Sequence, residues 1–292
     1  MRREVLAGVD GSAESVTAAL WAADEAALRG VPLRLLTVDA KNTGDHAWNI
    51  VRSARQWCHR AHGGIDIAED VLAGYPPQVL VRESTDAQLL VVGSRGLGAV
   101  TETLLGSVSM GVAMRANCPV VVVPRRRGSF ALGPVVLGVS GPSRGRAAIS
   151  FAFAEAALRG TALLAVHVWR PISWTEPAQL AAWSTMDGAR QDLTAELVDW
   201  ASGYPDVQLS TDVRYGSPAD ELSQAASAAQ LLVIGHCGTA LALGTVAHRT
   251  LHHADCPVAI VREEHRREDI VFFEAGGGAD ERQVPRDSNA AP

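Results

Sequence analysis

Residues 88–124 combine the residue types that can bind a phosphate group. The apolar run Leu89–Val92 has the length of a strand that is buried on both faces. The glycine-rich stretch Gly93–Gly98 follows it, and Gly106-Ser107 opens a helical pattern. Glycines let a backbone approach phosphate closely, and the first amides of a helix lack intrahelical acceptors. The stretch therefore predicts an anion site made largely of backbone N–H groups.

The spacing of these glycines restricts the type of loop. Two residues separate Gly93 from Gly96, nine separate Gly96 from Gly106, and Ser107 follows at once. A Walker A loop is excluded because Ala99 stands where its lysine belongs, and the Rossmann glycine fingerprint is not completed. The alternative is a strand-to-helix turn in which the glycines shape the backbone and bind nothing.

After a buried strand, the pattern G-x2-G-x9-G-[ST] resembles the nucleotide-binding signature of the universal stress protein family. A second stretch supports the resemblance, because the apolar segment Val5–Val9 is followed by Asp10-Gly11-Ser12. The resemblance implies an α/β, Rossmann-like fold related to the adenine-nucleotide α-hydrolases. In that fold a five-stranded parallel sheet of order 3-2-1-4-5 carries helices on both faces. A ligand would lie beyond the carboxyl ends of strands one and four.

The resemblance also implies roles by position. The acidic residue after the first strand would lie at the nucleotide, a residue of the second strand would meet adenine, and the glycine loop would hold phosphates. The implied binding residues are Val9, Asp10, Gly11, Ser12, Val38, Gly93, Ser94, Arg95, Gly96, Gly98, Gly106, Ser107, Val108 and Ser109.

Three of these residues have simpler explanations. Asp10 could cap the following helix, Arg95 could be a solvated loop cation, and Val38 could be an ordinary core valine. If they do bind the ligand, the planar guanidinium of Arg95 suits a phosphate, and the backbone of Val38 can read adenine without a special side chain.

The chain repeats itself at a long interval. Residues 25–30, Glu-Ala-Ala-Leu-Arg-Gly, recur unchanged at 155–160, and the triplet Cys118-Pro119-Val120 returns at 256–258. The interval is far too long for a solenoid, so the repetition indicates a duplicated domain. The tandem arrangement is similar to actinobacterial members of the family.

The repetition divides the chain into three parts. We predict one domain at residues 1–126 and a second at 131–263, joined by a short basic linker. The composition of residues 264–292 predicts a largely disordered tail, with Ile270–Phe273 as a small apolar exception.

The second copy departs from the nucleotide pattern. Ser140 replaces the acid at the position of Asp10, and only five residues separate Gly238 from Gly244-Thr245, where the first half has nine. A shortened loop should not wrap a triphosphate in the same way. We therefore expect one strong nucleotide site per chain, in the first half.

Composition excludes several other functions. A net charge of −6 gives no reason to expect nucleic acid, and no apolar run approaches the roughly 20 residues that cross a bilayer. The start of the chain reads as a strand and not as a signal peptide, and the four cysteines form no C-x-x-C pair, so we expect a reduced, cytoplasmic protein.

His252-His253 are adjacent on a helix and point in different directions, so we expect no metal there.

The function that follows is an ATP-binding stress-response regulator or nucleotide sensor. The pattern contains no base placed to activate water, so we assign no catalytic residue and expect slow or no hydrolysis. The alternatives are a protein-interaction module without a nucleotide, or a slow nucleotide hydrolase or transferase.

ATP is the expected ligand, with or without magnesium, and AMP, ADP and cyclic nucleotides stay open. A regulatory client protein is implied, but the sequence does not identify it.

The order 3-2-1-4-5 places Val120–Val123 and Val258–Val261 at sheet edges. Long apolar edges are hazardous when exposed, and proteins pair or cover them. The family commonly pairs these edges across a two-fold axis, so we expect the two halves to form an internal pseudo-dimer with antiparallel terminal strands. The alternative is two independent domains on a flexible linker. A homodimer would then use another surface.

Overall fold

The computed structural model of the 292-residue chain describes residues 4–42, 44–96, 105–124, 133–141, 145–169, 185–236 and 243–263. Gly98, the linker, Gly238 and the tail with Ile270–Phe273 lie outside these residues. In the described part, no helix is long and apolar enough to cross a membrane.

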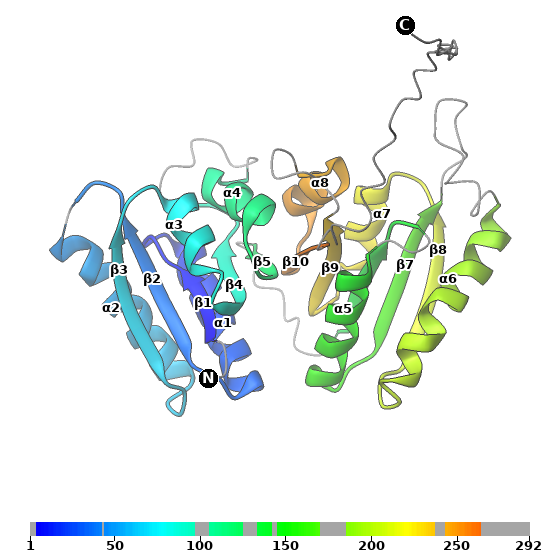
Figure 1. Cartoon of the computed structure of the whole chain (residues 1–292), viewed down its shortest axis with the longest axis horizontal. Coiled ribbons are helices and arrows are strands. Elements are labelled where there is room, and N and C mark those ends of the chain that lie inside the picture. The colour runs from blue at the N-terminus through cyan, green and yellow to red at the C-terminus, as the bar shows by residue number, and fades with distance from the viewer. Residues whose placement is uncertain are drawn as a thin grey trace, which may run out of the picture.

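Strands alternate with helices in both halves (Figure 1). The first half contains β1 (Glu4–Gly8), α1 (Ala13–Arg29), β2 (Leu33–Asp39), α2 (Asp45–Ala61), β3 (Ile67–Ala73), α3 (Pro76–Glu83), β4 (Ala87–Gly93), α4 (Ser107–Arg115) and β5 (Val120–Val123). The second half contains β6 (Val135–Val139), α5 (Arg146–Arg159), β7 (Leu163–Trp169), α6 (Met186–Ser202), β8 (Leu209–Tyr215), α7 (Pro218–Ala225), β9 (Leu231–His236), α8 (Thr245–His253) and β10 (Val258–Arg262).

All of these strands join one ten-stranded sheet of order β3-β2-β1-β4-β5-β10-β9-β6-β7-β8. Every neighbouring pair is parallel except β5 and β10. The order within the first half is therefore 3-2-1-4-5, and the second half repeats it as a pseudo-two-fold image (Figure 1). The predicted fold class is confirmed.

Local sequence signals set the ends of the helices that begin each half. The hydroxyl of Ser12 accepts a hydrogen bond from the backbone N–H of Ser15 and caps α1. Gly30 ends α1 in the left-handed conformation at φ 61°, and Gly160 ends α5 at φ 59°. Because the hexapeptide 25–30 recurs at 155–160, it gives both helices the same C-terminal cap.

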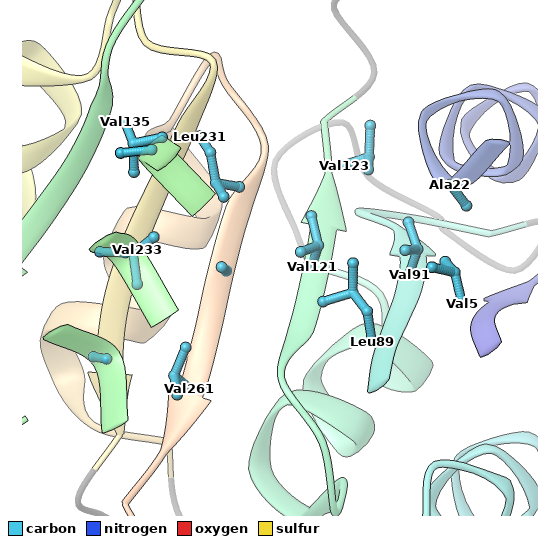
Figure 2. Packing of buried hydrophobic residues seen from close by; sticks show 14 of the residues in the cluster. Val5, Ala22, Leu89, Val91, Val121, Val123, Val135, Leu231, Val233 and Val261 are labelled. Carbon is cyan, nitrogen blue, oxygen red and sulfur yellow. The ribbon is translucent and has the colours of Figure 1, made fainter. Parts of the chain in front are cut away.

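Each face of the sheet carries a core that continues through both halves. One core lies under α1, α2, α5 and α6, and the other lies under α3, α4, α7 and α8. Alternate residues of β5 supply the two cores, since Val121 and Val123 face the first and Val120 and Val122 face the second. Figure 2 shows the first core at the junction of the halves, with Val121 on β5 and Val261 on β10.

The junction is an antiparallel pair of the two terminal strands. Val121 lies opposite Ala259, with Val122 opposite Val258 and Val120 opposite Ile260. All four residues of β5 are buried. The expected antiparallel pairing within one chain is confirmed, and the apolar edges of both half-sheets are removed from water.

A second contact joins the halves where α1 meets α5. Arg29 binds the carboxylates of Glu25 and Glu155, and Arg159 binds the same two carboxylates. The side chains of Glu25 and Glu155 are only 4% and 2% exposed. Burial raises the pKa of Glu25 to about 7, although Arg159 and Arg29 act in the opposite direction. This single charge tetrad is made from two copies of the same hexapeptide, one from each half.

Removing one cation from the tetrad should destabilise the chain strongly. We expect Arg29→Met to cost about 3–5 kcal/mol, because the two buried carboxylates then share one guanidinium. Replacing all four residues by Leu or Met should cost much less, because no buried charge is left uncompensated. Urea unfolding of both variants measures the difference. Equal losses would show that the charges do not depend on one another.

The register of the junction allows a direct cross-linking test. Directly opposite residues of an antiparallel pair have Cα atoms about 4.5–5.5 Å apart, which a disulfide can bridge. Val121→Cys with Ala259→Cys should therefore form an intrachain disulfide, detected by peptide mapping of the oxidised monomer.

The matched control moves one cysteine by one residue. Val121→Cys with Ile260→Cys places the thiols on opposite faces of the sheet, so this pair should stay reduced. Cross-linking of both pairs, or of neither, would contradict the register.

Candidate functional site

A crevice of about 890 Å³ opens at the carboxyl ends of β1, β2 and β4. It lies at the switch point of the sheet, where the chain leaves β1 with β2 on one side and β4 on the other. Its volume is in the range of sites for small molecules and cofactors. Its described lining residues are Gly8, Val9, Asp10, Ser15, Leu36, Thr37, Val38, Asp39, Ala40, Lys41, His46, Ala47, Ile50, Pro76, Leu80, Val92, Gly93, Arg95, Gly96, Leu105, Gly106, Ser107, Val108 and Ser109.

The structure brings most of the sequence-predicted binding residues together in this crevice. Ten of the fourteen line it: Val9, Asp10, Val38, Gly93, Arg95, Gly96, Gly106, Ser107, Val108 and Ser109. Gly11, Ser12 and Ser94 are neighbours in the chain but do not line the crevice, and Gly98 is outside the described residues.

Asp10 connects the end of β1 to the glycine loop. Its Oδ1 accepts hydrogen bonds from the hydroxyl of Ser12 at 2.6 Å and from the backbone N–H of Ser12 at 3.0 Å. A Cβ atom on Gly96 would stand only 2.2 Å from its Oδ2. Since Ser12 caps α1, the capping role considered for Asp10 belongs to Ser12, and the carboxylate of Asp10 faces the loop.

Two hydrogen bonds hold the ends of the glycine loop together. The backbone N–H of Gly106 donates to the carbonyl of Ser94 at 2.8 Å. The buried hydroxyl of Ser109 donates to the carbonyl of Gly93 at 2.6 Å. The end of β4 and the start of α4 are therefore fixed next to each other, as an anion site between a strand and a helix requires.

The first turn of α4 lines the crevice. Gly106 is the N-cap residue, and among the described residues no side chain caps the first amides. Ser107, the first helical residue, is exposed and lines the crevice together with Arg95. Free amides, a hydroxyl and a guanidinium at one helix start are the groups that bind phosphate.

Gly93 is required for packing. A Cβ atom at this position would lie 2.9 Å from the backbone of Glu14, in the first turn of α1. The absence of a side chain lets α1 lie directly over the end of β4. This close approach brings the loops after β1 and β4 to the same crevice.

The opposite wall of the crevice comes from β2 and α2, and the sequence pattern found only Val38 there. Thr37, Asp39, Lys41, His46 and Ile50 also line this wall. Asp39 accepts a hydrogen bond from the N–H of Gly44 at 2.8 Å and shapes the turn before α2. Lys41 is the single lysine of the 292 residues. A count of lysines would have drawn attention to Lys41, but the residues next to it in the sequence do not indicate that it lines a crevice.

The second half has a different arrangement at the start of α5, which is the counterpart of α1. The carboxylate of Glu263, just after β10, accepts hydrogen bonds from the amides of Ala147 at 3.3 Å and Ala148 at 3.5 Å, in the first turn of α5. The same carboxylate lies 3.7 Å from a Cβ built on Gly235, the counterpart of Gly93. A negative charge of the chain itself therefore stands beside the helix start in this half.

Comparisons with known proteins agree on one family. A model of the Universal stress protein family matches residues 1–124 and 132–262. A universal stress protein of Mycobacterium tuberculosis is 33% identical over 285 residues, which cover 89% of this chain and 97% of the relative. One of Mycolicibacterium smegmatis is 34% identical over 284 residues, covering 88% and 96%.

Among solved structures, a universal stress protein from Archaeoglobus fulgidus superposes with a TM-score of 0.70 at 19% identity, covering 90% of this chain and 97% of that one. At this identity the likeness shows the fold alone.

Two glycine substitutions should separate packing from the site. Gly93→Ala places a Cβ against the backbone of Glu14, which cannot move away without shifting α1, so we expect lower stability. Among the described residues, the Cβ of Gly96→Ala meets the end of the Asp10 side chain alone, so the fold should keep its stability while the carboxylate is displaced. Urea unfolding of both variants tests this, and equal destabilisation would contradict it.

Proposed function

The chain belongs to the universal stress protein family, and we propose that its first half binds an adenine nucleotide, ATP in particular, as a regulatory sensor. The observation that carries the proposal is the joined pair of β4 and α4. Gly106 and Ser107 start a helix without a side-chain cap inside a crevice that also contains Val38 and Asp10. A phosphate group and a base can therefore be bound in one cavity.

The dimensions of the crevice agree with this ligand. β1 lies between β2 and β4, so Val38 and Gly93 stand two strand spacings apart, roughly 9.5 Å. A nucleotide bound across β1 would place its base beside Val38 and Ile50 and its phosphates at Gly106 and Ser107. Its ribose would lie over Asp10, and an acidic residue is a common partner of ribose hydroxyls.

The charged groups of the wall fit the same orientation. Arg95, at the glycine loop, would pair with phosphate oxygens, and the free amides of α4 would add hydrogen bonds. Magnesium is compatible with this arrangement but is not required by it, because the amides and the guanidinium already face the anion.

The acidic groups of the crevice favour binding over hydrolysis. Asp10 accepts two hydrogen bonds from Ser12, and Asp39 accepts one from Gly44. Both carboxylates are thus held by hydrogen bonds within the chain, at the turns that follow β1 and β2. We therefore propose slow or no ATP hydrolysis, with the bound nucleotide controlling contact with a client protein.

One site per chain is part of the proposal. In the second half the carboxylate of Glu263 stands at the start of α5, the counterpart of α1, and beside Gly235, the counterpart of Gly93, so it would repel a phosphate at these strand ends. The acid of the first half is replaced by Ser140. Both features weaken the second half as an ATP site.

A pair of matched substitutions tests the proposed site. Gly106→Glu brings a negative side chain to the start of α4. A Cβ there lies no closer than 3.4 Å to any described residue, so the fold should survive. Binding of labelled ATP should fall by about tenfold or more, because the anion site is then filled by a carboxylate. Gly244→Glu, at the equivalent position of the second half, should leave the affinity unchanged.

Stoichiometry and product analysis complete the test. We expect one ATP to bind per chain and no appreciable ADP to form over hours. Competition by ADP, AMP or cyclic AMP ranks the ligands. A folded chain that binds no adenine nucleotide would favour the interaction module. Steady release of product over many turnovers would favour the hydrolase. Equal losses in Gly106→Glu and Gly244→Glu would contradict a single site in the first half.

A further inference from the structure

Two histidines lie one helical turn apart on α8, away from the crevice of the first half. The ring centroids of His248 and His252 are 4.7 Å apart, with the rings inclined by 56°. Residues separated by four positions share a helix face, so both imidazoles project from the same side. His248 is exposed and His252 is half-buried, so solvent ions have access to the pair.

The sequence pattern had drawn attention to a different pair. His252 and His253 are adjacent, and their ring centroids are 6.5 Å apart. Adjacent helical residues point in different directions, as the sequence analysis argued. The structure shows that the partner of His252 is His248, in the preceding turn.

We propose that His248 and His252 together bind one divalent transition-metal ion such as Zn²⁺. Imidazole nitrogen is a preferred ligand of Zn²⁺, Cu²⁺ and Ni²⁺. Within the described residues, no group of three or more histidines, cysteines and acids converges on one point. The described residues therefore supply two ligands, and water or another group completes the coordination.

The electrostatics of the helix suit a cation. His252 lies in the last turn of α8, where the carbonyl groups at the end of the helix favour positive charge. The closest cation on the helix, Arg249, is bound to Asp220 of α7 at 3.3 Å.

The duplication provides an internal comparison. Counting from Gly106 and Gly244, the counterparts of His248 and His252 in α4 are Met110 and Met114. Both positions of the pair therefore differ between the halves. The metal-binding pair occurs in the half whose nucleotide loop is shortened.

The test uses the full-length chain and ZnCl₂, titrated in competition with a chromophoric chelator. We expect one Zn²⁺ per chain to depend on the pair. His248→Asn and His252→Asn should each weaken binding by about tenfold or more, since each removes one of two protein ligands. His253→Asn, one residue along the same helix, is the matched control and should change the affinity by less than about twofold.

Imidazole ¹⁵N chemical shifts give a readout that does not depend on affinity. Addition of Zn²⁺ should move the ring-nitrogen signals of His248 and His252 together and leave that of His253 unchanged. Circular dichroism establishes that each variant is folded. Absence of zinc binding by the wild-type chain would overturn the proposal. So would retained affinity in folded His248→Asn, or an equal loss in His253→Asn.

Discussion

The apolar edge strand of each half cannot stay exposed to water, and pairing the two edges organises the molecule. All four residues of β5 are buried, although β5 would be the outer strand of an isolated half-sheet. Antiparallel pairing with β10 satisfies its free backbone groups and extends both cores across the junction. The pairing also sets the pseudo-two-fold relation between the halves, because the strands meet with Val121 opposite Ala259. One constraint thus determines both the stability of the edges and the relative placement of the two domains.

The charge tetrad between α1 and α5 depends on that pairing. Once β5 and β10 are aligned, the same hexapeptide from each half arrives at the pseudo-two-fold axis, and Glu25 and Arg29 meet Glu155 and Arg159. Burying four charges is costly, and attraction between them offsets the cost only when every partner is in place. Such a cluster adds little net stability, but it opposes any arrangement that separates the partners. In this chain the apolar strand pair supplies the driving force, and the charges make one register preferable to its neighbours.

The two halves share a fold but differ in what their helix starts can bind. In the first half, close packing of Gly93 on α1 and the hydrogen bond from Gly106 to Ser94 leave the amides of α4 facing a crevice. In the second half, Glu263 bonds to the start of α5, the counterpart of α1, and α8 carries His248 and His252 where α4 has methionines. Duplication therefore produced one scaffold twice, and a few substitutions at the strand ends and on one helix gave the copies different chemistry.

The sequence by itself determined the repeated domain, the parallel sheet order through its resemblance to the family, and the glycine residues that line the crevice. These features depend on neighbouring residues, so their patterns can be read directly from the chain. Only the tertiary structure decided that Lys41 and Ile50 form the opposite wall, that Asp10 faces Gly96 while Ser12 caps the helix, and that Glu25 meets Arg159. The partners in these contacts come from segments far apart in the chain, and their meeting depends on packing angles between strands and helices. No local pattern encodes those angles, because they follow from how all the buried side chains fill the two cores together.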